Sequence, residues 1–138
     1  MNELAAAERL AATQNAFRVL IVDDDPDMVA FFGRLLAKEA MSVDAVYDGA
    51  AALAHIAATP PDLVLLDVMM PRKSGYEVCQ RVRGRPEWRH IKIIMLSAKG
   101  REVEVSKGVS LGADLYITKP FSNTELVAKI DGLLAGTP

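Results

Sequence analysis

Short apolar runs alternate along the chain with segments in which apolar residues recur at helical intervals. Three runs are nearly continuous in apolar residues and cover residues 18–22, 62–67 and 91–96. Two weaker runs cover residues 42–46 and 114–118. Strands that are buried on both faces have this composition, as expected for a parallel sheet covered by helices.

Residues that favour helix starts precede the helical segments. In chain order, these candidate caps are Asp25, Asp48, Ser74 and Ser122. Pro26 suits a first helical position, and Glu125 stands at capping-box spacing after Ser122. A further helix is expected from about residue 100 to residue 111, ending at Gly112.

The pattern amounts to five strand–helix units, which predicts an α/β fold. Connections between parallel strands are right-handed almost without exception, so the units build a doubly wound sheet with helices on both faces. We expect one domain over residues 17–138. Residues 1–16 lie outside the repeat as an extension that is either helical or disordered, because its helix propensity is high but it has little apolar surface to bury.

Composition narrows the setting of this domain. The chain has 138 residues, a formal net charge of −2 and a single cysteine, Cys79, which excludes an intramolecular disulfide and a Cys-based zinc site. No run is long enough to span a bilayer and no signal-peptide pattern opens the chain. We therefore expect a cytoplasmic protein that does not bind membranes.

A basic stretch near the middle of the chain is the main candidate for nucleic-acid contact. It contains Arg81, Arg83, Arg85 and Arg89, with Trp88 among them. Such stretches are usually solvated helix ends, and no DNA-binding motif accompanies this one. We expect no direct contact with nucleic acid.

Polar residues with useful chemistry stand at the ends of the predicted strands. They are Asp23, Asp24, Asp67, Ser97 and Lys119. In a doubly wound sheet, ligands bind at the carboxyl ends of the strands. Converging carboxylates repel one another unless a cation neutralises them, and Mg²⁺ prefers such oxygen ligands together with phosphate oxygens. One aspartate could then act as the nucleophile toward a phosphoryl group.

Four blocks around these residues resemble a known family. They cover residues 19–26, residues 62–71 with Gly75, residues 95–98 and residues 116–121. Together they resemble the receiver domains of response regulators in two-component signalling (the CheY-like superfamily), over about residues 17 to 134. The resemblance implies a flavodoxin-like receiver fold with strand order 2-1-3-4-5.

The resemblance also implies roles for individual residues. Asp67 matches the phosphoacceptor. Asp23 and Asp24 match the acidic pair that organises Mg²⁺ with it, and Met69 stands where a backbone carbonyl binds the metal.

Three further positions match residues that respond to phosphorylation. Ser97 matches the switch hydroxyl, Lys119 the lysine that contacts the phosphoryl group, and Tyr116 the aromatic switch residue.

The implied function is that of a signalling protein. A histidine kinase or a histidine phosphotransfer protein would phosphorylate Asp67, and the surface of the fourth helix, fifth strand and fifth helix would then change. The protein would catalyse only its own Mg²⁺-dependent phosphorylation and dephosphorylation. A downstream protein partner, an appended output domain and a phosphorylation-dependent dimer all stay open.

Two other classes of protein compete with this interpretation. An aspartate-nucleophile phosphatase of the haloacid-dehalogenase type would share the strand-end aspartate and the lysine, but it normally has a second aspartate where this chain has Met69. A flavodoxin-like binding module would share the fold. The acidic residues 23–25 would repel the phosphate of a flavin.

Overall fold

The centre of the molecule is a parallel sheet of five strands in the order β2-β1-β3-β4-β5. The computed structural model describes residues 17–68, 74–97, 112–118 and 121–135. The strands are β1 (Arg18–Val22), β2 (Ser42–Val46), β3 (Leu63–Asp67), β4 (Lys92–Ser97) and β5 (Leu115–Thr118). The predicted fold and strand order are confirmed, and no strand boundary differs from its predicted position by more than one residue.

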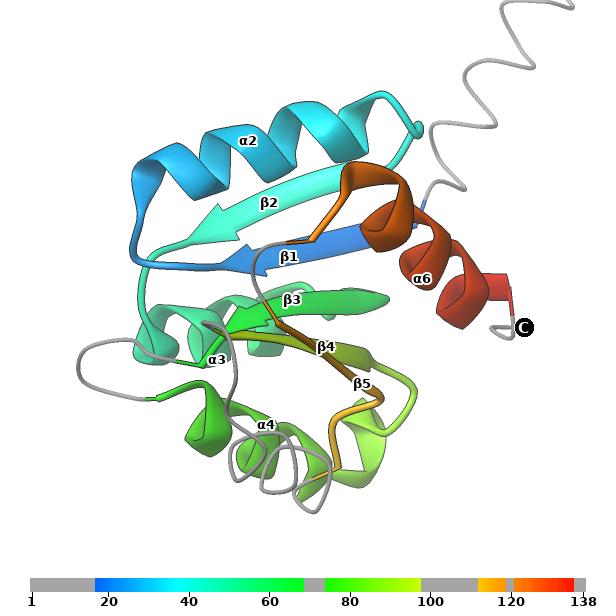
Figure 1. The fold of residues 1–138 in the computed structure, drawn as a ribbon. Coiled ribbons are helices and arrows are strands. Elements are labelled where there is room, and N and C mark those ends of the chain that lie inside the picture. The colour runs from blue at the N-terminus through cyan, green and yellow to red at the C-terminus, as the bar shows by residue number, and fades with distance from the viewer. Residues whose placement is uncertain (1–16, 69–73, 98–111, 119–120, 136–138) are drawn as a thin grey trace, which may run out of the picture.

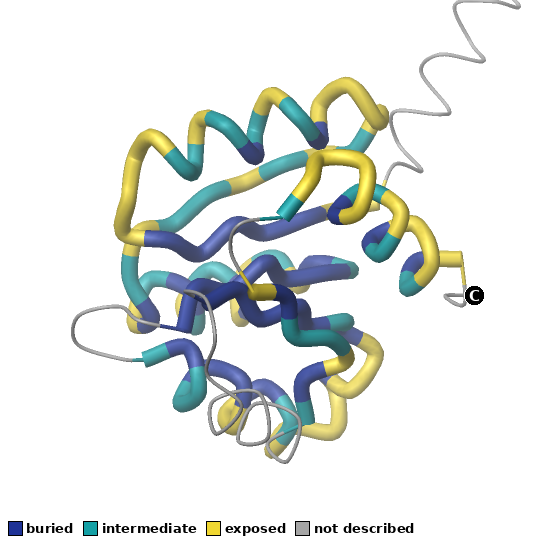
Figure 2. The backbone as a smooth tube through the Cα atoms, in the orientation of Figure 1, coloured by how far each residue is buried: buried dark blue, intermediate teal, exposed yellow. Residues whose placement is uncertain are grey.

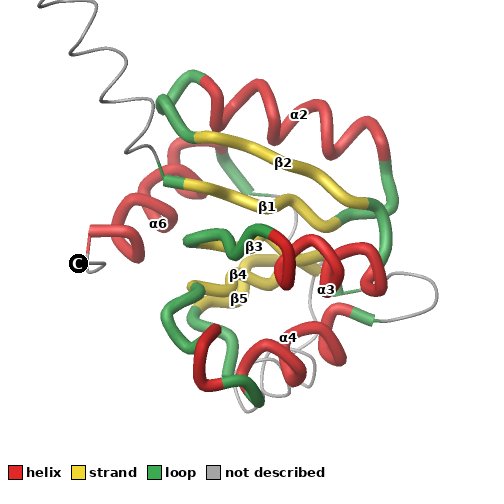
Figure 3. The backbone as a smooth tube through the Cα atoms, turned by 180° about the vertical axis from the view of Figure 1, so that it is seen from behind, coloured by secondary structure: helices red, strands yellow, loops and turns green. Residues whose placement is uncertain are grey.

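Helices cover both faces of the sheet (Figures 1 and 3). The α-helices in the described ranges are α2 (Pro26–Ala37), α3 (Gly49–Ala58), α4 (Gly75–Arg83) and α6 (Asn123–Ala135), and a 3₁₀ helix, η1, covers Pro86–Trp88. The helix predicted over residues 100–111 lies outside the described residues. None of the helices in the described part of the chain is long and apolar enough to cross a membrane.

The predicted caps satisfy backbone groups that helix ends leave unpaired. The four hydrogen bonds run from Asp27 N to Asp25 Oδ1 (3.0 Å), Ala51 N to Asp48 Oδ1 (2.8 Å), Glu77 N to Ser74 Oγ (3.3 Å) and Glu125 N to Ser122 Oγ (3.0 Å). Each of these four helices therefore begins at a residue that the sequence specifies, in the connection that follows the carboxyl end of a strand.

The strands divide the core into two layers. Leu20 and Val22 pack with residues of α3 and α4. Val19 and Ile21, which alternate with them along β1, pack with residues of α2 and α6. All are at most 1 % exposed, and full burial of such a side chain contributes about 1.5–3 kcal/mol. The buried strands lie between helices whose outer surfaces are exposed (Figure 2).

Arg83 differs from the solvated residue that the basic stretch predicted. It lies at the end of α4, and its guanidinium donates to Gly112 O (2.8 Å), Ile91 O (2.7 Å) and Asp114 Oδ2 (2.7 Å). The same oxygen of Asp114 accepts a hydrogen bond from Ile93 N (2.7 Å). The Arg83 side chain therefore ties the end of α4 to the starts of β4 and β5.

This network predicts that Arg83→Met lowers the free energy of unfolding by about 2–3 kcal/mol, because a carboxylate and two carbonyls lose a charged donor. Arg81→Met is the matched control. Its side chain is 60 % exposed and its contact with Glu77 is 4.0 Å long, so a change within about 0.5 kcal/mol is expected. Urea unfolding of both variants measures the difference, and equal losses would show that the network adds nothing.

Candidate metal and phosphoryl site

The register of the sheet brings the predicted acidic residues together. Val22 is the partner of Leu66 across β1 and β3, so the next residues in the two strands, Asp23 and Asp67, emerge beside each other. The arrowheads of β1 and β2 mark this edge at the left of Figure 1. The carboxyl ends of parallel strands all lie at the same edge of the sheet, and the strand order places β1 next to β3 at its centre.

Three carboxylates form one cluster at this edge. Each of Asp23, Asp24 and Asp67 offers an oxygen, and these oxygens all lie within 4.8 Å of one another. Asp23 is 2 % exposed and Asp67 is 8 % exposed, whereas Asp24 is exposed. Buried like charges at this separation need a compensating positive charge. The all-oxygen set, with one open side at Asp24, fits a hard divalent cation such as Mg²⁺.

The turn after β1 fixes the orientation of Asp23. Its backbone N–H donates to Val46 O (3.2 Å), and its Oδ1 accepts from Asp25 N (3.0 Å). Asp25 in turn caps α2. Because the same short turn ends β1 and begins α2, the Asp23 carboxylate is held at the sheet edge by local backbone geometry.

Gly75 allows α4 to begin directly against the end of β3. Its N–H donates to Val68 O (3.0 Å), and a Cβ at this position would lie 2.5 Å from the backbone oxygen of Asp67. No side chain other than hydrogen fits there without moving the backbone that carries Asp67. Gly75 belongs to a motif in the sequence, but the steric reason for glycine at this position becomes visible only in the structure.

Ser97 and Tyr116 come from the neighbouring strands. Ser97 is the last residue of β4, is 1 % exposed, and pairs in register with Thr118 of β5. Tyr116 is half-buried and packs against the core layer on the α3 and α4 side. Lys119 follows Thr118 in the chain, and both Lys119 and Met69 lie outside the described residues. Of the predicted site residues, the structure thus brings Asp23, Asp24 and Asp67 together and places Ser97 at the same edge.

A family model matches most of the chain. The model of the response regulator receiver domain matches residues 19–131, which include the acidic cluster and all five strands except Arg18 at the start of β1.

Solved structures of receivers are similar over most of the chain. A Chloroflexus aurantiacus protein described as a response regulator is 36 % identical, with a TM-score of 0.83, over 88 % of this chain and 99 % of that one. The signal receiver domain of a signal transduction histidine kinase from Syntrophus aciditrophicus is 32 % identical, with a TM-score of 0.83, over 88 % and 92 %. The BeF₃-activated receiver domain of Klebsiella pneumoniae RstA is 31 % identical, with a TM-score of 0.79, over 85 % and 97 %.

The tight contact at Gly75 predicts that Gly75→Ala destabilises the fold by about 1–3 kcal/mol, because backbone atoms cannot move aside as a flexible side chain could. Gly33→Ala is the control, since a Cβ at Gly33 in α2 meets nothing within 4 Å. That variant should gain up to about 1 kcal/mol from helix propensity. Opposite signs in chemical unfolding are expected, and a stabilised Gly75→Ala would contradict the steric argument.

Proposed function

Because the chain belongs to the family of response regulator receiver domains, we propose that Asp67 accepts a phosphoryl group from a histidine kinase or a histidine phosphotransfer protein. The observation that carries the proposal is the convergence of Asp23, Asp24 and Asp67 within 4.8 Å at the carboxyl edge of the sheet, two of them buried. Asp67 stands at the end of the central strand β3, where a donor can approach from the edge.

Asp23, Asp24 and Asp67 would hold Mg²⁺, and the family resemblance adds the backbone carbonyl of Met69. The bound cation would supply positive charge against the carboxylates and the phosphoryl oxygens. Asp23 is buried, and its carboxylate accepts a hydrogen bond from Asp25 N. It would therefore bind the metal from a fixed position, either directly or through a water molecule. Asp24, which is exposed, is the ligand that solvent and metal reach directly.

Phosphoryl transfer at Asp67 needs positioning more than covalent assistance. A carboxylate oxygen of Asp67 attacks phosphorus, the P–N bond of the donor phosphohistidine breaks, and the imidazole nitrogen keeps the electron pair. Lys119 and the Ser97 hydroxyl would stabilise the phosphoryl oxygens. Hydrolysis then ends the signal. Water attacks the phosphorus of the acyl phosphate, the bond between phosphorus and the Asp67 oxygen breaks, and inorganic phosphate leaves the restored Asp67 carboxylate.

The same site would control a surface. We assign the switch to Ser97 and Tyr116. We assign the surface that changes to the helix predicted over residues 100–111, strand β5 and the last helix, α6. Ser97 is buried at the edge of the sheet, and its register partner on β5 is Thr118, two residues after Tyr116. The similar Klebsiella domain is described as BeF₃-activated, which supports the proposal that this fold can adopt an activated state.

A signalling role follows from this assignment. The protein would act on itself alone, taking up and releasing its phosphoryl group, and would pass the message to a downstream partner, an output domain or a second copy as a phosphorylation-dependent dimer. We propose that the protein is cytoplasmic, because its phosphoryl donor would depend on ATP. The similar Syntrophus domain is the receiver of a signal transduction histidine kinase, which supports a second arrangement for this protein, in which the donor is part of the same polypeptide.

Acetyl phosphate with Mg²⁺ should add one phosphoryl group to the protein, detected as a single mass increment in intact-protein mass spectrometry. Asp67→Asn should take up none, because an amide is a poor nucleophile. Asp44→Asn is the control, since Asp44 is an exposed carboxylate on β2 whose side chain pairs with His55 at 3.4 Å. It should be labelled as fully as the unmodified protein.

Two further results separate the rival functions. Removal of Mg²⁺ with a chelator should lower labelling by at least about tenfold, given the share of charge stabilisation that metals supply in such reactions. Sustained turnover of a small phosphoester would favour the phosphatase. Full labelling of Asp67→Asn would overturn the assignment of the acceptor.

A further inference from the structure

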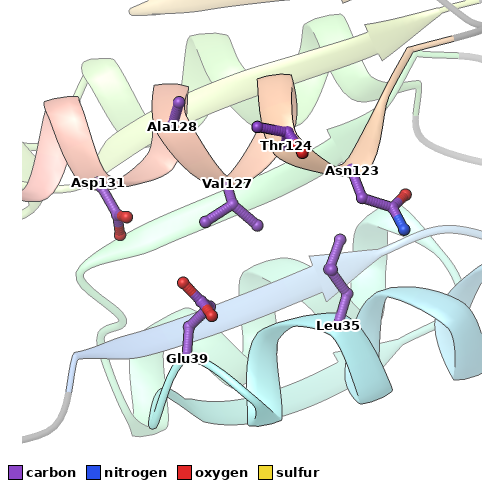
Figure 4. Close-up of a pocket in the computed structure, with 7 residues that line it drawn as sticks. All are labelled: Leu35, Glu39, Asn123, Thr124, Val127, Ala128 and Asp131. Atoms are coloured by element: carbon purple, nitrogen blue, oxygen red, sulfur yellow. The ribbon is translucent and has the colours of Figure 1, made fainter.

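A groove lies between α2 and α6, on the face of the sheet opposite α3 and α4. Its volume is about 370 Å³, and its apolar part is formed by Leu35, Val127 and Ala128. Figure 4 shows Leu35 of α2 and Val127 of α6 pointing toward each other across the space between the two helices. The groove is separate from the acidic cluster, which belongs to the carboxyl edge of the sheet.

One end of this groove is negatively charged. Glu39 from the end of α2 and Asp131 from α6 project toward the space between the helices at the end where β1 begins (Figure 4). Both are exposed, and within the described ranges neither carboxylate has an ion pair or a hydrogen bond. The other end carries Asn123 and Thr124. The groove therefore suits a mainly apolar segment that brings one cation to its charged end.

The chain outside the described residues begins beside that charged end. Phe17 accepts a hydrogen bond at its carbonyl from Ser42 N (2.9 Å), three residues beyond Glu39. Among the residues that the structure describes, Phe17 is one of two exposed large hydrophobic residues, at 37 %. Residues 1–16 precede it and must start from this corner of the molecule.

The composition of residues 1–16 matches the groove. The segment contains Leu4, Leu10 and several alanines, which are small enough for a shallow groove, and its single basic side chain is Arg9. Adjacent residues on a helix point about 100° apart, so Arg9 can face the groove while Glu8 faces solvent. Alone, a helix of this length is marginal in water, and it gains stability only by packing.

The dimensions also agree. The groove runs along α6 from Asn123 to Asp131, which corresponds to about 12 Å of helix. Residues 10–16 can span up to about 25 Å when extended, enough to bring Arg9 to the charged end after a reversal of the chain. A second copy of the chain is the alternative occupant, and a contact of that kind would depend on protein concentration.

We propose that residues 1–9 pack as a helix along the groove between α2 and α6, with Arg9 at Glu39 and Asp131 and with Leu4 and the alanines at positions 5–7 over Leu35, Val127 and Ala128, while residues 10–16 connect this helix to Phe17. The contact is intramolecular, and the groove shares no lining residue with the acidic cluster of the phosphoryl site. It gives the extension a defined position on the α2 and α6 face of the domain.

A spin label on Ala6→Cys in the full chain tests the contact. Burial raises the pKa of the native Cys79 thiol to about 11, so the label attaches to the engineered cysteine. In the amide NMR spectrum we expect the signals of Leu35, Val127 and Ala128 to lose more than half of their intensity. The signals of Ala54 and Arg81, on the opposite face, should keep theirs.

Charge variants of the labelled protein test the orientation. Arg9→Glu should restore most of the lost intensity, and combining it with Glu39→Lys and Asp131→Lys should remove the signals again. Glu87→Lys, an exposed reversal on η1, is the matched control and should change nothing. Signal loss spread evenly over the surface, loss confined to the α3 and α4 face, or loss that grows with protein concentration would each overturn the proposal, the last because it identifies a second copy as the occupant.

Discussion

Electrostatic repulsion among Asp23, Asp24 and Asp67 is the constraint around which this structure is organised. A parallel register that pairs Val22 with Leu66 leaves no freedom in where the following aspartates emerge, and two of them are buried. Such a cluster is costly without a cation, so the fold holds it with rigid elements. Asp23 is fixed by the turn that starts α2, and the backbone of Asp67 is fixed by the close approach of Gly75 at the start of α4.

Away from this edge, the sheet is held in register by contacts that have no chemical role. Arg83 joins α4 to the starts of β4 and β5 through Gly112, Ile91 and Asp114. The strand β5 carries Tyr116, and its last residue, Thr118, lies beside Ser97. The structure therefore has a fixed base at the amino ends of β4 and β5 and places its polar groups at the opposite, carboxyl ends. This division allows one end of a strand to respond while the other keeps its position.

Local features of the fold and the edge that the parallel strands share were predictable from the sequence, whereas long-range side-chain contacts away from that edge were not. Asp25 and Ser74 could be identified as caps because a cap bonds to residues two or three positions away. The acidic cluster could be predicted because parallel strands share an edge. The prediction that Arg83 is solvated was wrong. Its partners Gly112 and Asp114 are about thirty residues away in the sequence, and contacts at that distance produce no periodic pattern. The short helix at Pro86–Trp88 was missed because a single turn has too few residues for a pattern.

The response of folding stability to Mg²⁺ tests whether the carboxylate cluster of Asp23, Asp24 and Asp67 needs a divalent cation. Chemical unfolding of the protein in the presence of Mg²⁺ at 100 times its dissociation constant should show a gain of about 2.7 kcal/mol, by mass action on the folded state. Asp67→Asn, which removes one of the three charges, should lose most of that gain, whereas Asp44→Asn should keep it. An equal gain in Asp67→Asn, or no gain in the unmodified protein, would show that the three carboxylates do not form a site that needs Mg²⁺.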